Sequence, residues 1–309
     1  MADRPLNGGH LHARARSRAA AVSIASNTAL ILLKVVAGVL TGSVAILTEA
    51  LHSGIDLLAS LIAFFSVRGA EEPADAGHRY GHDKFENAAA AAEGMLILAG
   101  SAVIAFAAIR ALINGPHLEN LGIGIVVIGF ASVANLAVSS WLFRRARETD
   151  SPALHGDAAH LRTDAYTSIG VLVGLALVSV TGQHWLDPVV ALLIAVAIVI
   201  TGVRITMGSL RVLVDEALPD EELEAIRAQI ETFADRGVVG YHQLRTRQAG
   251  ARRYVDLHVQ FRRGTSLEEA HRTAHALQDA IEAEIKNADV LIHLEPEDRV
   301  RPGEVLRRG

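Results

Sequence analysis

The chain contains no cysteine, so it can form neither a disulfide nor a thiolate metal site. A metal ion would have to be held by histidine, carboxylate or backbone oxygen, and the 14 histidines are a generous supply. The nucleotide-binding sequence Gly-x-x-x-x-Gly-Lys-Ser/Thr is absent, which argues against a protein driven by ATP hydrolysis. His-Glu-x-x-His, the signature of a zinc protease, is absent too. The formal net charge of −5 favours no particular partner.

Long apolar blocks dominate the first two thirds of the chain, and half of all residues are apolar. A helix needs about 20 mostly apolar residues to cross a bilayer. The sequence therefore predicts a multi-pass membrane protein with a six-helix transmembrane bundle within residues 19–210. We expect the spans at 19–40, 44–67, 87–113, 121–143, 153–181 and 186–205.

The positive charges predict the orientation of these spans. The connections 41–43, 114–120 and 182–185 carry no lysine or arginine, whereas the opposite flanks of the helices are basic. Because positive charge favours the cytoplasmic side, both termini are predicted to be cytoplasmic, with residues 1–18 as a polar tail. The Ala- and Arg-rich composition favours a prokaryotic plasma (inner) membrane.

The pattern after residue 210 is that of a small soluble domain, residues 211–298, followed by a charged tail at 299–309. Alternating apolar residues predict half-buried strands, and Ser266 with Glu269 predicts a capping box at the start of a helix. The expected order is α-β-β-α-β, an α+β sandwich. Its elements are predicted at 220–233, 238–247, 252–261, 266–285 and 290–295, with Gly250 in the turn between the first two strands.

Two of the predicted spans carry the same pattern, acid-x-x-His-x-x-x-Asp. Ionisable residues inside a span are costly and so mark functional sites. Spacings of three, four and seven place each set on one helical face. The sets are Glu49, His52 and Asp56 in the second span, and Asp157, His160 and Asp164 in the fifth.

Depth in the membrane predicts that the two patterns form one site. At 1.5 Å per residue, Asp56 lies roughly 18 Å from the outer end of its helix, and His160 and Asp164 lie roughly 10–17 Å from the inner end of theirs. Two imidazoles and two carboxylates, from His52, Asp56, His160 and Asp164, suit tetrahedral Zn²⁺. The alternative is that these side chains only join helices by hydrogen bonds. Glu49 and Asp157 are candidate pathway acids on either side, or they pair with neighbours or face water.

The chain resembles the cation diffusion facilitator family of divalent-metal/proton antiporters from about residue 18 to residue 297. The resemblance rests on Gly42-Ser43, on the stretches 49–56, 78–84 and 160–164, and on Val214-Asp215. It implies that His52, Asp56, His160 and Asp164 form the transport site. In the family, His at the position of His52 leans toward Zn²⁺, and Asp there leans toward broader selectivity.

The resemblance also implies a second metal site in the loop between the second and third spans. The matching residues are Asp75, His78 and His82. A helical turn would put the two histidines on one face. The alternative is a solvated basic loop.

The soluble domain resembles the family's metallochaperone-like cytoplasmic dimerisation domain, which in some members binds zinc between subunits. The matching residues are His242, His258, His271, His293 and Glu295. Some relatives have Asp at the position of Glu295. Because Glu is one methylene longer, this difference argues against a role of Glu295 as a bridging metal ligand. His275 is an alternative ligand, although a solvated residue is the favoured interpretation. Lys84 and Asp215 match an inter-helix pair, or are ordinary surface charges.

The predicted function is secondary active export of a divalent metal, with Zn²⁺ favoured, in exchange for protons. Free imidazole titrates at about pH 6.5, close to cytoplasmic pH. Because a metal ion binds only the neutral imidazole, metal and proton compete for the same groups. Zn²⁺ would serve as substrate and as a structural or regulatory ion, with no organic cofactor and no enzymatic activity. The expected partners are the bilayer and a second copy of the chain, not nucleic acid. Cd²⁺, Fe²⁺, Co²⁺ or Mn²⁺ are alternative substrates, and a membrane-embedded metal sensor is a distant alternative function.

Overall fold

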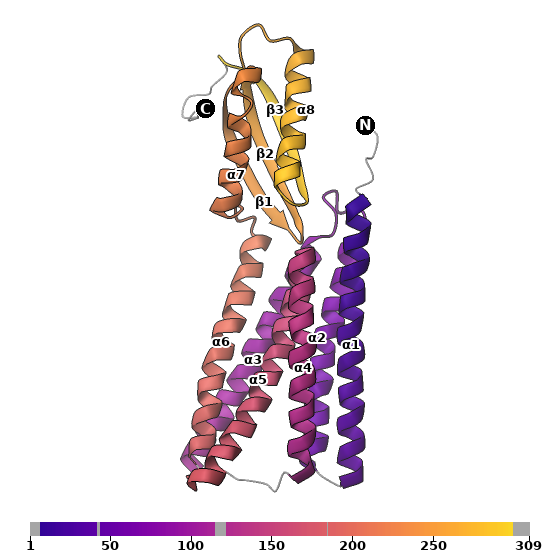
Figure 1. The fold of residues 1–309 in the computed structure, drawn as a ribbon, viewed down its shortest axis with the longest axis vertical. Helices are drawn as coiled ribbons and strands as arrows, with labels where there is room; N and C mark the ends of the chain where they lie inside the picture. The colour runs from indigo at the N-terminus through magenta and orange to yellow at the C-terminus, as the bar shows by residue number, and fades with distance from the viewer. Residues whose placement is uncertain (1–6, 42–43, 115–121, 184, 299–309) are drawn as a thin grey trace. The chain divides into compact units, whose positions relative to one another are not determined.

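The computed structural model describes residues 7–41, 44–114, 122–183 and 185–298. Within some helices it describes the backbone but not every side chain, and the side chains of residues 44–53, 55 and 56 lie outside the description. The chain divides into two compact units, Met1–Leu210 and Arg211–Gly309 (Figure 1).

The described residues of the first unit form six long helices (Figure 1). Four stretches in them are long and apolar enough to cross a membrane, at Ala15–Val36, Lys84–Asn114, Pro152–Val178 and Pro188–Leu213. The transmembrane character is therefore confirmed, whereas the number of six spans stays a prediction. The helices are α1 (Asn7–Thr41), α2 (Val44–Ala70), α3 (Lys84–Asn114), α4 (Gly122–Thr149), α5 (Pro152–Thr181) and α6 (Leu186–Leu213).

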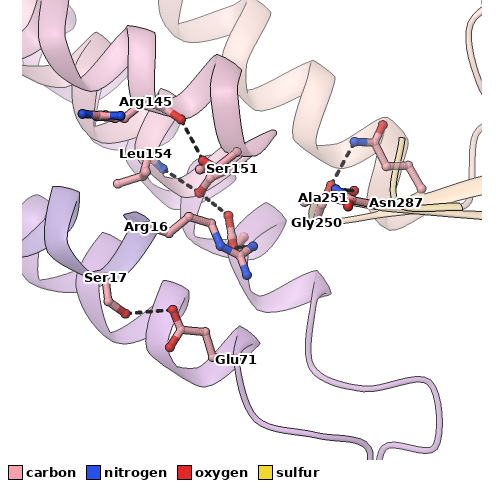
Figure 2. A network of polar contacts seen from close by, with 12 residues as sticks. Arg16, Ser17, Glu71, Arg145, Ser151, Leu154, Gly250, Ala251 and Asn287 are labelled. Carbon is pink, nitrogen blue, oxygen red and sulfur yellow. Dashed lines mark hydrogen bonds and ion pairs between the residues drawn. The ribbon is translucent and has the colours of Figure 1, made fainter. Parts of the chain in front are cut away.

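The first helix begins at Asn7, so much of the segment that we expected as a polar tail is helical. A buried ion pair explains this difference. Arg16, only 8% exposed, donates to the fully buried carboxylate of Glu86 on α3 over 2.6 Å. Ser151 donates to the other oxygen of the same carboxylate (Figure 2). The ion pair holds the arginine-rich segment against the bundle, where continuing the helix satisfies its backbone.

Helix α5 lies at the centre of the contacts in this unit, since it packs against α2, α3 and α4. Its start is fixed by Ser151, whose hydroxyl accepts the backbone N–H of Leu154, and by Pro152 in the first turn. Its end is fixed by Gly182, which adopts a left-handed conformation with φ of 71°. Buried Ala158 and Leu161 belong to its apolar contact surface.

The second unit has the predicted order α-β-β-α-β, with a short 3-10 turn, η1 (Ala234–Arg236), after its first helix. Strands β1 and β2 are antiparallel, and β2 and β3 are parallel. Ser266 caps the second helix by accepting the N–H of Glu269, as the capping box predicted. The elements are α7 (Asp220–Glu231), β1 (Val238–Ala249), β2 (Arg252–Phe261), α8 (Leu267–Glu284) and β3 (Ala288–Pro296).

The apolar side chains of β2 form the core with α7 and α8, which leaves the alternate side chains on the other face of the sheet. On that face His258 lies beside His242 of β1 and His293 of β3, and Gln260 lies beside Glu295. The register between β1 and β2 shifts between His242 and Arg245. The sheet therefore brings polar residues from three strands together.

Gly94 provides a test of the helix packing, because α6 leaves no room for a side chain there. A methyl group at Gly94 would lie 2.9 Å from the backbone nitrogen of Thr206 and would overlap its hydroxyl. A methyl group at Gly100 on the same helix would meet no heavy atom of another described segment within 4 Å. Both Gly→Ala changes gain about 1 kcal/mol in helix propensity, whereas overpacking costs about 1–3 kcal/mol.

We therefore expect Gly94→Ala to lower the thermal unfolding midpoint in detergent relative to Gly100→Ala. Fluorescence-monitored melting of the two variants measures the difference. Equal midpoints would mean that α3 and α6 do not pack this closely.

Candidate metal centres

The fifth helix carries the described half of the predicted transport site. His160 and Asp164 lie one turn apart on α5, and the imidazole Nε2 is 3.7 Å from a carboxylate oxygen of Asp164. Both are largely removed from solvent, with side chains 9% and 19% exposed. Their predicted partners on α2, His52 and Asp56, have side chains outside the described residues, as does Glu49. The meeting of the two halves stays a prediction.

Asp157, the candidate pathway acid on α5, lies in a buried hydrogen-bond network. One of its carboxylate oxygens accepts the hydroxyl of Ser60 on α2 over 2.9 Å. Ser60 in turn accepts the side-chain amide of Asn27 on α1 over 2.6 Å, and its oxygen is 3.1 Å from that of Ser23. The polar side chains of three helices thus meet at Asp157. This arrangement favours the alternative in which Asp157 pairs with its neighbours.

Two buried acids of α3, Glu86 and Glu93, were missed as functional candidates in the sequence. Glu86 is explained by its ion pair with Arg16. Glu93 is fully buried, and neither of its carboxylate oxygens has a hydrogen-bond partner among the described residues. An available signal was overlooked, because both acids lie in or beside a predicted span, where an ionisable residue marks a site.

The loop between α2 and α3 brings Asp75, His78 and His82 together. The two oxygens of the Asp75 carboxylate lie 3.5 Å from His78 Nδ1 and 3.6 Å from His82 Nε2. The imidazole rings are 4.4 Å apart between centroids. Ligand atoms from all three residues lie within 4.8 Å of one another, a spacing that a single ion could bridge.

The loop brings these three side chains together without the helical turn that the spacing of the two histidines suggested. Residues 71–83 form no helix, and the chain turns at Gly81, whose φ is 85° and whose N–H bonds to the carbonyl of His78. Asp75 organises the turn by accepting the backbone N–H of Gly77 and of His78. The hydrogen bond from the His78 backbone also lowers the pKa of Asp75, which keeps it ready to bind a cation.

The sheet of the second unit holds a third cluster around Glu295 of β3. Its two carboxylate oxygens each lie 2.9 Å from an imidazole nitrogen, Nε2 of His242 on β1 and Nδ1 of His258 on β2. His293 Nε2 lies 3.5 Å from the carboxylate, on a side chain that is 61% exposed. Glu295 is one methylene longer than the Asp of some relatives. This extra length does not prevent its carboxylate from contacting two histidines within one chain.

Two further residues of this unit, His271 and Gln260, lie outside this three-residue cluster. His271 lies on α8 with its ring 4.5 Å from that of His275, and it is not part of the three-residue cluster that one chain assembles. Its role as a ligand would need a second copy and stays a prediction. Gln260, missed in the sequence, is fully buried beside Glu295, and neither atom of its amide has a hydrogen-bond partner among the described residues.

The charge state of Glu295 favours the binding of a cation by this cluster. Partial burial raises the pKa of Glu295, but hydrogen bonds from His242 and His258 outweigh it and leave this pKa below its ordinary value. The carboxylate is therefore ionised at neutral pH. Two nitrogens and one oxygen within 4.8 Å of one another fit Zn²⁺, which accepts both ligand types and leaves a fourth position for water or another chain.

The predicted pair of Lys84 and Asp215 would link the two units and stays a prediction. Within the second unit, Asp215 lies 3.4 Å from the guanidinium of Arg247. Both residues are partly exposed, so this ion pair contributes about 0–1 kcal/mol.

The chain matches two family models that together span most of its length. The cation efflux transmembrane domain matches residues 20–214, and the cytoplasmic domain of cation efflux proteins matches residues 218–297. The three clusters lie within these matched regions.

Curated relatives are similar over nearly the whole chain. An uncharacterized transporter of Synechocystis is 35% identical over 277 residues, which cover 90% of this chain and 89% of that protein. The cation-efflux pump FieF of Klebsiella pneumoniae is 36% identical over 286 residues, covering 92% and 94%. Among solved structures, CzrB in its zinc form is 37% identical and covers 28% of this chain and 98% of that one, with a TM-score of 0.27.

Removing the central carboxylate should weaken metal binding by the cluster in the second unit. We expect Glu295→Gln to weaken Zn²⁺ binding there by at least about tenfold, because the amide carries no charge for the ion. Isothermal titration of the purified full-length protein would then detect one fewer tight equivalent per chain. Glu297→Gln, two residues on, is the matched control, since within the described part of the chain the Glu297 side chain accepts only the backbone N–H of Arg263. An unchanged number of tight equivalents in Glu295→Gln would contradict this site.

Proposed function

Because the chain belongs to the cation diffusion facilitator family and so exports divalent metal cations, we propose that its substrate is Zn²⁺, exchanged for protons across the membrane. The observation that carries this proposal is the pair of buried His160 and partly buried Asp164, one turn apart on α5. The sequence repeats the same spacing at His52 and Asp56 in α2, a helix that packs against α5.

The choice of zinc rests on the donor set. Two imidazoles and two carboxylates give an N₂O₂ set, which suits tetrahedral Zn²⁺ better than Mg²⁺ or Ca²⁺, because those ions prefer oxygen ligands alone. Cd²⁺, Fe²⁺, Co²⁺ and Mn²⁺ are the competing substrates.

Proton exchange follows from the same groups. Zn²⁺ needs neutral imidazole and ionised carboxylate, so protons compete with the metal for the site. When the site opens to the cytoplasm it binds Zn²⁺ and releases protons. When it opens to the more acidic outer side, protons displace the metal. The proton gradient then drives export without nucleotide hydrolysis.

The assembly that fits this function is a homodimer in a plasma (inner) membrane, with both termini in the cytoplasm. The match to the cytoplasmic domain of cation efflux proteins supports a cytoplasmic location of the second unit. Closed two-fold assembly is the commonest outcome for homo-oligomers, and a second copy offers His271 or His293 as further ligands for the Glu295 cluster. Zn²⁺ held there and at Asp75 would be structural or regulatory.

Loss of the aspartate on α5 should stop transport. We expect Asp164→Ala in proteoliposomes to reduce Zn²⁺ flux driven by a pH step to the level of empty vesicles, because the site loses a charged ligand. His155→Ala is the control, since His155 is an exposed histidine of the same helix that packs on Phe143. Wild-type flux in Asp164→Ala would exclude this site. A wild-type protein that binds Zn²⁺ without moving it would support the sensor alternative.

The histidine on α2 should set the ion preference. His52→Asp replaces a nitrogen ligand by oxygen, and we expect Cd²⁺ or Mn²⁺ flux to rise relative to Zn²⁺ flux, since harder oxygen donors discriminate less in favour of zinc. Parallel flux assays with the three ions measure the ranking. If the ranking is unchanged, His52 does not determine selectivity.

A further inference from the structure

Glu93 of α3 is the buried acid that the proposed transport site does not use. It lies in a stretch that is long and apolar enough to cross the membrane. Its side chain is fully buried, and both carboxylate oxygens lack a hydrogen-bond partner among the described residues. An ionised carboxylate in such surroundings is costly unless a cation balances it.

The surroundings of Glu93 bring a second acid instead of a base. The carboxylate fills the space beside Gly156 of α5, where an added Cβ would lie 3.1 Å from the Glu93 carboxyl carbon and would overlap one of its oxygens. The next residue on α5 is Asp157, which is also fully buried and whose negative charge acts on Glu93. One oxygen of Asp157 accepts Ser60, and the other has no partner among the described residues.

The other helices that pack near Glu93 add no described charge. The neighbouring Gly94 meets Thr206 and Gly202 of α6, which contribute a hydroxyl and backbone only. Helix α2 contributes Ser60 to the Asp157 network, while the side chains of its acids Glu49 and Asp56 lie outside the described residues. Within the described part of the chain, the titratable group whose charge acts on Glu93 is therefore Asp157.

Two adjacent buried carboxylates cannot both be ionised without a positive charge between or near them. A metal ion requires several ligands, and the described residues assemble no cluster of three ligating groups at Glu93. A proton needs only one oxygen. The pair is thus suited to hold one proton while no metal is near.

We propose that Glu93 is a proton-binding residue of the exchange cycle, coupled to the metal through α5. The inference rests on the proposed function. Asp157 precedes His160 by three residues, a rise of about 4.5 Å along the helix, so a divalent ion at His160 and Asp164 adds positive charge close to the acid pair. That charge stabilises the ionised Glu93, whose O–H bond breaks and whose proton leaves to solvent. When the metal leaves, the carboxylate takes up a proton again.

The test counts protons released on metal binding. Purified full-length protein in weakly buffered detergent solution receives Zn²⁺ in the presence of a pH-indicator dye. Glu93→Gln keeps the shape of the protonated acid but has no proton to release, so we expect it to bind Zn²⁺ while releasing one proton fewer per chain than wild type. Glu71→Gln is the matched control, because Glu71 is exposed and, among the described residues, bonds only Ser17.

Equal proton release in Glu93→Gln and wild type would overturn the inference. So would loss of Zn²⁺ binding in a folded Glu93→Gln, since Glu93 would then act as a metal ligand. Infrared difference spectra of the wild-type protein give a measurement that needs no variant: addition of Zn²⁺ should remove the band of a protonated carboxyl group, and its persistence would also overturn the inference. Failure of the proposed function is distinguishable, because it appears as wild-type flux in Asp164→Ala whatever Glu93 does.

Discussion

The first unit is governed by the cost of placing a charge inside hydrocarbon, which falls only when an opposite charge, a hydrogen-bond donor or a proton is supplied. Glu86 meets this condition with Arg16, Asp157 with Ser60, and Asp164 with His160. Each solution joins different helices or successive turns, so the polar contacts also fix how the bundle packs. Among the acids buried in the described part of this unit, Glu93 has none of these partners, which makes it the group most dependent on an exchangeable cation.

The sequence predicted those features that depend on period and length alone. Apolar blocks located the helices of the first unit, because a span must be long and apolar whatever it contacts. Two-residue alternation located β2 and placed His258 on the face opposite the core, and the same rule placed His293 and Glu295 together on β3. The start of α8 followed from the local chemistry of Ser266 and Glu269.

Features that depend on contacts distant in the sequence could not be predicted in this way. The pairing of Arg16 with Glu86 spans 70 positions, and it extends α1 toward the N-terminus beyond its apolar block. The loop histidines converge through the turn that Asp75 organises, not through a helix. His242 reaches Glu295 across two strand pairings, next to a register shift in β1 that no alternation rule foresees.

The two kinds of cluster differ in a way that suits different tasks. At Glu295, hydrogen bonds from two histidines lower the pKa of the carboxylate and so keep it ionised. Such a cluster suits an ion that stays. Inside the bundle, the charge balance of each acid depends on very few neighbours, so a single arriving or departing cation alters it strongly at low dielectric. The same residue types can therefore serve both the exchangeable site that we propose in the bundle and the lasting site that we propose in the sheet.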